Sequence, residues 1–198
     1  MKIAHHYVGL VGWRSLSFSE YDRVYCDSLM LLFVAKCFGI KLDYLPGAKS
    51  LRALDAGSKK NVYLTPFPLS QFPENQQFQL PKFDSVTSIP DQVQAWLEEN
   101  ANACTVYIGI STPNQNILGS LITQKYQLEV HCVGAALIEA CSPSYRKVNL
   151  VSGTGFEWVY RGVKSPKRFV EKIGQILVAV IGLARNKSHR SEFKKLFD

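Results

Sequence analysis

The chain has 198 residues, of which 46% are hydrophobic and 20% are charged. This globular composition excludes a disordered or collagen-like protein, and the length predicts one domain with room for an appendage. The formal net charge of +7 lies at the C-terminal end, because residues 1–160 carry 13 basic and 13 acidic residues whereas residues 161–198 carry 10 and 3. A basic segment of this kind favours an anionic partner such as lipid headgroups, a diphosphate or nucleic acid, although a solvated helix would also account for it.

The cysteines and the apolar stretches restrict the class of protein further. Five cysteines without a CxxC pair predict neither a zinc site nor a disulfide framework, and they fit a reducing cytosol. The first residues lack the apolar core of a signal peptide. The longest nearly uncharged apolar stretch, residues 173–184, has about 12 residues where a bilayer requires about 20, so no transmembrane helix is expected.

The first predicted elements are a short strand at residues 23–26 and a helix at residues 28–38, which Gly39 terminates. Asp27 therefore lies where a strand passes into a helix. A carboxylate at this position serves either as a helix N-cap or as a general base. The residue type alone leaves both roles open.

The middle of the chain predicts further alternation of strands and helices. Residues 61–65 read as a strand, five prolines within 66–90 indicate mostly loop, and a helix is expected near 91–97. Residues 105–110 form the strongest strand, apolar on both faces as in the centre of a parallel sheet.

The remaining elements follow in the same alternation. A polar loop at 111–116 precedes a helix from about residue 117, and residues 128–133 form another buried strand that ends at Gly134. The segment from residue 155 reads as two helices, the second beginning at Pro166.

This order predicts an α/β fold: a Rossmann-like, mostly parallel sheet flanked by helices, with a basic helical C-terminal appendage. Residues 1–154 are expected to form the core and residues 155–198 the appendage. Ligands of such sheets bind beyond the carboxyl ends of the strands. Asp27, the 111–116 loop and the turn at 134–136 all follow strands, so the topology predicts that they meet at one edge.

Two groups of residues are candidates for binding. The segment 109–116 offers backbone N–H groups at a helix start together with the side chains of Thr112 and Gln115, which suit phosphate and sugar hydroxyls, although an ordinary capped turn has the same composition. Histidines are weaker candidates. His131 lies in an apolar strand and reads as a core residue, and His5 and His6 could bind a metal only with partners that the sequence does not reveal.

Several blocks of the chain resemble the WecG/TagA/CpsF family of glycosyltransferases. Residues 22–28 look like its "aDlvlPDG" segment, with Asp27 at the acidic position. Residues 106–115 look like "llVglGaPkQe", with Gln115 at the glutamine, and residues 133–136 are similar to "vGgaFd". Residues 155–161 with 165–168 are similar to "GlEWlyRl…ePrR", which is the most specific of these blocks.

The resemblance implies an inverting, metal-independent hexosyl- or N-acetylhexosaminyltransferase. It would move a sugar from a UDP-sugar, its donor substrate, to a polyprenyl-diphosphate-linked glycan in bacterial cell-surface or exopolysaccharide assembly. No cofactor is implied.

The resemblance also implies a role for each matched residue. Asp27 would be the catalytic base. The substrate-binding residues would be Thr112, Gln115, Gly134, Arg161, Lys167 and Arg168.

The implied partners are the UDP-sugar, the lipid-linked acceptor and an anionic membrane surface, with a second copy of the chain also considered and no nucleic acid. The expected location is the cytoplasmic face of the cell membrane, with peripheral attachment. Two other readings stay open: a non-catalytic binding subunit of the same fold, and an α/β domain that binds nucleic acid through its basic tail.

Overall fold

The computed structural model describes residues 4–8, 22–27, 29–45, 61–70, 72–100, 105–134, 136–137 and 166–195. The strands are β1 (Ala4–Val8), β2 (Asp22–Cys26), β3 (Asn61–Thr65), β4 (Gln77–Gln79), β5 (Thr105–Ile108) and β6 (Glu129–Cys132). The helices are α1 (Leu29–Cys37), α3 (Asp91–Asn100), α4 (Asn114–Tyr126), α8 (Pro166–Arg185) and α9 (Lys187–Lys195), with a 3-10 turn η2 at Glu74–Gln76.

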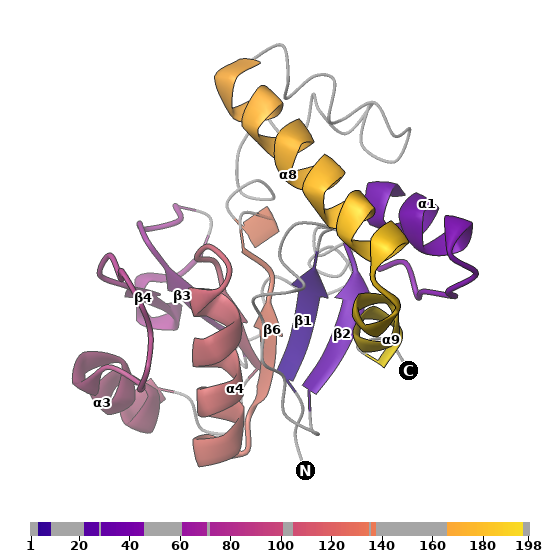
Figure 1. Ribbon diagram of the computed structural model, residues 1–198. Coiled ribbons are helices and arrows are strands. Elements are labelled where there is room, and N and C mark those ends of the chain that lie inside the picture. Colours follow the sequence, from indigo (N-terminus) through magenta and orange to yellow (C-terminus); the bar gives the residue numbers. More distant parts are fainter. Residues whose placement is uncertain are drawn as a thin grey trace.

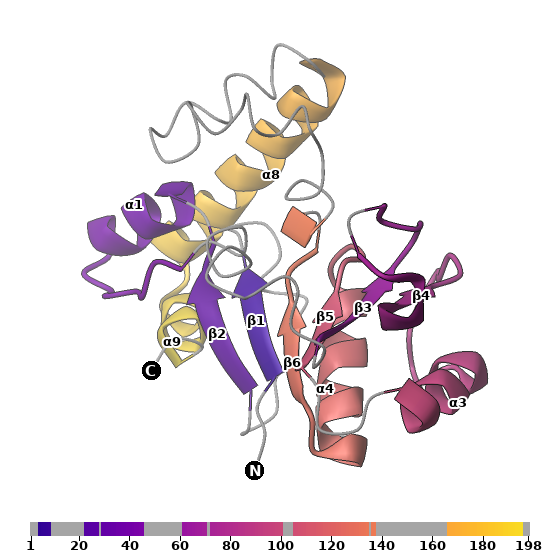
Figure 2. The same cartoon turned by 180° about the vertical axis from the view of Figure 1, so that it is seen from behind.

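The six described strands form one sheet in the order β2-β1-β6-β5-β3-β4, and every pair is parallel. Helices α4 and α9 lie on the same side of this sheet (Figure 1). The view from behind shows β2, β1 and β6 with no described helix across them (Figure 2). The fold is therefore the predicted α/β, Rossmann-like arrangement.

The largest core lies between the sheet and the helices α3 and α4. It consists of aliphatic side chains that alternate strand residues present to one face, among them Val62, Val106, Ile108 and Val130. Gly119 of α4 lies so close to β6 that a methyl group there would clash with the Cys132 sulfur. The absence of a side chain at this position allows the helix to lie directly on the strand.

A second core joins the C-terminal helices to the N-terminal part of the sheet. Leu183 of α8 and Phe193 of α9 are fully buried against Leu31 of α1 and Cys26 of β2. The basic segment is therefore helical, as predicted, and its far end packs on the sheet. The expected boundary between residues 154 and 155 lies outside the described residues.

A buried polar network ties β1 to β2 and α4. His6 Nε2 lies 3.2 Å from Asp22 Oδ2, the Asn116 amide nitrogen lies 2.7 Å from His6 Nδ1, and the Ser120 hydroxyl donates to Asp22 Oδ2 at 2.7 Å. The side chains of His6 and Asp22 are at most 1% exposed. Such groups are tolerated in a core only when they are hydrogen-bonded, so the network fixes which residues of the three elements face one another.

The predicted elements agree with this structure except in four places. The helix predicted from Pro166 is divided after Arg185 into α8 and α9. Helix α4 begins at Asn114 and not near residue 117, because Pro113 already has helical backbone angles (φ −88°, ψ −12°). Strands β1 and β4 were not predicted. β1 is difficult to recognise because its histidines interrupt the apolar pattern typical of a parallel strand.

No described helix is long and apolar enough to cross a membrane.

Glycine-to-alanine substitutions in α4 and α8 should have opposite effects on stability, because Gly119 of α4 lies against the sheet and Gly174 of α8 does not. Gly119→Ala should lower the free energy of unfolding by about 1–3 kcal/mol, because the added methyl group overpacks the core. Gly174→Ala in α8, where nothing lies within 4 Å of the added carbon, should raise it by about 0.5–1 kcal/mol through helix propensity. Urea denaturation measures both, and a stabilising effect at Gly119 would contradict the packing described.

Candidate functional site

The carboxyl edge of the sheet gathers three of the predicted site residues. Gly134 follows β6, while Thr112 and Gln115 lie in the connection from β5 to α4. The Gln115 amide nitrogen donates to the Thr112 hydroxyl at 3.1 Å. A carbon added at Gly134 would lie 3.1 Å from the Gln115 side-chain oxygen. The structure thus brings these three residues together at the edge where the topology predicts a ligand.

Gln115 is the central residue of this group. Its side chain is buried, the residue being only 3% exposed, and its amide oxygen has no hydrogen-bond partner. A buried amide oxygen without a partner is costly in a folded protein, so it marks a position where a donor from a ligand would be stabilising. Thr112, by contrast, is exposed.

Backbone hydrogen bonds hold the two strand ends in place. The N–H groups of Val133 and Gly134 both donate to the Ile108 carbonyl, at 3.1 and 3.0 Å, and the Gly109 N–H donates to the Leu64 carbonyl at 2.8 Å. Gly134 has a φ of +56°, which L residues with side chains rarely adopt. Glycine is therefore required there both for the turn and for the contact with Gln115.

Asp27 lies on the same edge but further along it. It follows β2, which β1 separates from β6, so about 10 Å of sheet separates the two strands at roughly 4.8 Å per strand. Asp27 is exposed, and its neighbour Cys26 exchanges backbone hydrogen bonds with Asp43 and Leu45. The carboxylate is therefore outside the hydrophobic core, as a base that meets a substrate must be.

The basic residues of the predicted site are only partly described. Arg161 lies outside the described residues. Lys167 and Arg168 belong to the first turn of α8, where the backbone is described and the side chains are not. The substrate-binding role that the resemblance implies for these three residues stays a prediction.

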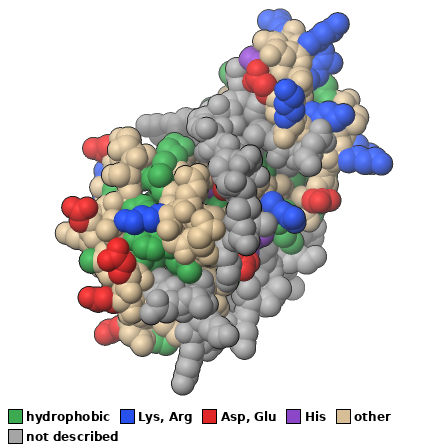
Figure 3. Space-filling view, turned by 90° about the horizontal axis from the view of Figure 1, so that it is seen from below, with side chains coloured by type: hydrophobic (Ala, Val, Ile, Leu, Met, Phe, Trp, Pro, Cys, Tyr) green, Lys and Arg blue, Asp and Glu red, His purple; other side chains and the backbone are tan. Residues whose placement is uncertain are grey.

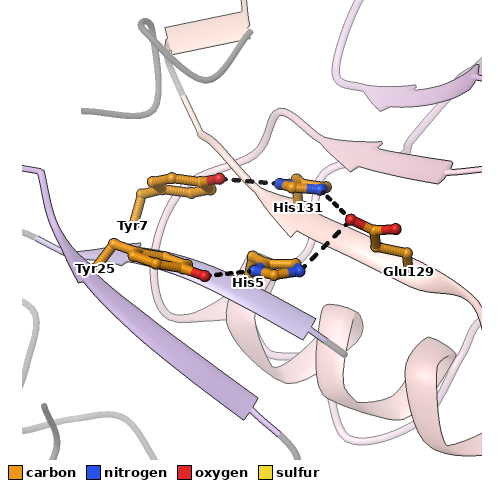
Figure 4. Close-up of polar contacts among 5 residues, drawn as sticks. All are labelled: His5, Tyr7, Tyr25, Glu129 and His131. Carbon is orange, nitrogen blue, oxygen red and sulfur yellow. Dashed lines mark hydrogen bonds and ion pairs between the residues drawn. The ribbon is translucent and has the colours of Figure 1, made fainter. Parts of the chain in front are cut away.

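A second group of polar residues, which the sequence did not bring together, lies on the face of the sheet opposite α4 (Figure 4). It consists of His5 and Tyr7 of β1, Tyr25 of β2, and Glu129 and His131 of β6. His5 Nδ1 shares a hydrogen bond of 3.0 Å with the Tyr25 hydroxyl, and His131 Nδ1 shares one of 2.9 Å with the Tyr7 hydroxyl. The Nε2 atoms of both rings point toward the Glu129 carboxylate.

Burial keeps both imidazoles neutral. It is the main cause that lowers the pKa of His5 to about 4, with His131 adding to the effect and Glu129 opposing it. Burial also lowers the pKa of His131 below its ordinary value, and the hydrogen bond to the Glu129 carboxylate opposes this effect. At neutral pH each ring therefore has one nitrogen lone pair that can accept a proton or bind a metal ion.

These residues belong to an aromatic ladder across the sheet. Ring centroids of neighbouring members lie 4.0–5.6 Å apart. In their order across the sheet, the members are Tyr25, His5, His131, Tyr107, Tyr63 and Phe72. The sequence offered one signal for it: polar aromatic residues at alternate positions of the strands. Their partners could not be identified without the strand order.

Comparisons of the chain with protein-family models, with curated proteins and with solved structures found no match.

The contact between Gly134 and Gln115 can be measured by comparing how much Gly134→Ala and Gly39→Ala lower the free energy of unfolding. Gly39→Ala and Gly134→Ala both place a side chain at positive φ, +69° and +56°, which costs about 1–2 kcal/mol. Nothing lies within 4 Å of the added carbon at Gly39, whereas the Gln115 amide faces it at Gly134. Gly134→Ala should therefore reduce the free energy of unfolding more than Gly39→Ala does. Equal losses in urea titrations would show that the amide is not held against residue 134.

Proposed function

We propose that this chain is an inverting glycosyltransferase that moves a sugar from a UDP-sugar to a polyprenyl-diphosphate-linked glycan. The observation that carries the proposal is the Gln115 amide, whose oxygen is buried without a hydrogen-bond partner beside Gly134 at the carboxyl edge of a parallel sheet. The exposed carboxylate of Asp27 lies on the same edge. The resemblance of the surrounding segments to the WecG/TagA/CpsF family supplies the reaction.

The proposed chemistry requires one base and a good leaving group. Asp27 takes the proton of the acceptor hydroxyl as the hydroxyl oxygen attacks the anomeric carbon of the donor. The bond from that carbon to the UDP oxygen breaks, and UDP leaves with the electron pair, so the configuration at the anomeric carbon inverts.

The other proposed site residues bind the substrates. Gln115 and Thr112 would hold hydroxyl or amide groups of the donor, with Gly134 leaving room for them. Arg161, Lys167 and Arg168 would stabilise the diphosphates, because cationic side chains and guanidinium forks complement phosphate oxygens.

The surface of α8 supports attachment to a membrane that contains the lipid-linked acceptor. Several large apolar side chains on this helix face solvent: Val170, Ile173, Leu177, Val178 and Ile181 are 38–68% exposed. Figure 3 shows Lys and Arg side chains gathered at the corner of the molecule where α9 lies. An apolar helix face beside basic residues is typical of a protein that lies on an anionic bilayer, here proposed to be the cytoplasmic face of the cell membrane.

A donor screen with an Asp27 variant tests the transferase proposal. The wild-type chain, given a panel of UDP-sugars and a short-chain polyprenyl-diphosphate sugar, should release UDP with at least one donor. Asp27→Asn should lower the rate by about 10²–10⁴-fold, which is the usual contribution of a general base, and should leave the fold unchanged. Release of UDP is measured by coupled assay and the product by mass spectrometry.

Glu99→Gln is the control, since Glu99 is an exposed carboxylate near the end of α3, the helix that leads into the amino end of β5. It should retain the wild-type rate. If folded wild-type protein releases no UDP with any donor, or if both variants keep full activity, the transferase proposal is wrong.

Partitioning into vesicles tests the role of α8. Leu177→Asp should weaken binding to phosphatidylglycerol-containing vesicles by at least tenfold, because burial of one leucine contributes about 1.5–3 kcal/mol and the new charge is repelled by the lipid. Ala95→Asp introduces the same charge at an exposed position of α3 and should have little effect. Equal binding of the two variants in a sedimentation assay would exclude the apolar face of α8 as the contact.

A further inference from the structure

Three potential metal ligands converge on the sheet face opposite α4. The Glu129 carboxylate oxygen lies 3.1 Å from His131 Nε2 and 3.6 Å from His5 Nε2. All three atoms lie within 4.8 Å of one another. Figure 4 shows both ring edges directed at the same carboxylate oxygen.

The strand register, and not the flexibility of surface side chains, produces this convergence. His5 is paired directly with His131 across the β1–β6 ladder, and their rings stack at a centroid distance of 4.5 Å. Glu129 stands two residues before His131 and therefore on the same face of the sheet. The three ligand positions are thus fixed by the backbone of two adjacent strands.

The spacing suits a tetrahedral ion. Zinc lies about 2.0–2.1 Å from histidine nitrogen and carboxylate oxygen, so two ligands of a tetrahedron lie about 3.3 Å apart. The observed nitrogen–oxygen distances of 3.1 and 3.6 Å bracket this value. The two rings are stacked at an interplanar angle of 11°, so they must rotate out of this arrangement for both Nε2 lone pairs to reach one ion.

The opposite nitrogen of each ring already has the partner that a metal-binding histidine requires. The hydroxyl groups of Tyr25 and Tyr7 lie within hydrogen-bond distance of Nδ1 of His5 and His131. A tyrosine hydroxyl can donate or accept, so each Nδ1 can carry the proton while Nε2 presents its lone pair to an ion. Such outer partners fix ring orientation in metal sites, and they are an observation independent of the ligand distances.

The site is accessible from solvent on the carboxylate side. The Glu129 side chain is 39% exposed, whereas those of His5 and His131 are 16% and 10% exposed. An ion can therefore enter past Glu129, and three protein ligands leave a coordination position for water.

We propose that His5, Glu129 and His131 form a binding site for a divalent first-row transition metal ion, which we assign as Zn²⁺. Two imidazoles and one carboxylate favour zinc over Mg²⁺ and Ca²⁺, which prefer oxygen ligands. The site uses no residue of the proposed transfer reaction and is independent of it. The sequence left His5 as a metal ligand only with partners that it did not reveal, and Glu129 and His131 are such partners.

Titration of metal-free protein with zinc chloride tests the proposal. Calorimetry should show one ion bound per chain, and zinc should raise the melting temperature of the wild type. Glu129→Gln preserves the shape of a half-exposed side chain and should weaken zinc binding at least tenfold. Tyr25→Phe and Tyr7→Phe should each weaken it about 10- to 100-fold, the usual effect of removing an outer partner of a ligand.

The controls separate this site from general binding to the surface. Glu99→Gln, at an exposed position of α3, should bind zinc like the wild type, and magnesium chloride should give no binding heat. A variant of the buried His131 is not used, because its replacement would also disturb the core. Glu129→Gln decides the question because the Glu129 side chain is not in the core. The proposal is overturned if folded wild type takes up no zinc, or if Glu129→Gln binds it with unchanged affinity.

Discussion

The structure depends on the parallel pairing of β1 between β2 and β6. This five-residue strand is paired with Asp22–Cys26 on one side and with residues 130–132 on the other. It therefore joins β2, α1 and the C-terminal helices to the rest of the sheet. A slip of one residue would exchange the two faces of β1 and remove every contact of His5 and His6 described above.

The two histidines show how that register is specified. His6 faces α4, where Asp22 and Asn116 surround it, whereas His5 faces the other side, where Tyr25 and Glu129 contact it. The polar partners of His6 described above lie on the α4 side of the sheet, and those of His5 lie on the opposite side. The alternative register would place unpaired polar groups in the aliphatic core, which costs far more than the hydrogen bonds gained.

Much of the fold was predictable because most strands are apolar runs between loop signals. Strand β3 has the bounds that the sequence predicts, and β5 and β6 differ from the prediction by one or two residues at their ends. Strand β1 was missed because its polar residues are satisfied by partners more than a hundred positions away, such as Asn116 for His6. Local patterns carry no information about such partners.

The part of the candidate site that lies at strand ends was predictable, whereas the part that depends on strand pairing was not. Strand ends indicated that Thr112, Gln115 and Gly134 lie on one edge, because carboxyl ends of parallel strands share an edge. The group formed by His5, Glu129 and His131 required knowledge that β1 pairs with β6. Residue types alone made His131 a core histidine, and it is indeed buried, but its ring nitrogens contact Tyr7 and Glu129.

The central claim is that the carboxyl edge of this sheet binds a nucleotide-activated sugar. The most direct measurement is a titration of ¹⁵N-labelled protein with UDP, followed by the backbone amide shifts. The account predicts that the largest shift changes fall at residues 109–115, at Gly134 and at Asp27. Changes confined to the opposite edge of the sheet, or none at saturating UDP, would contradict it.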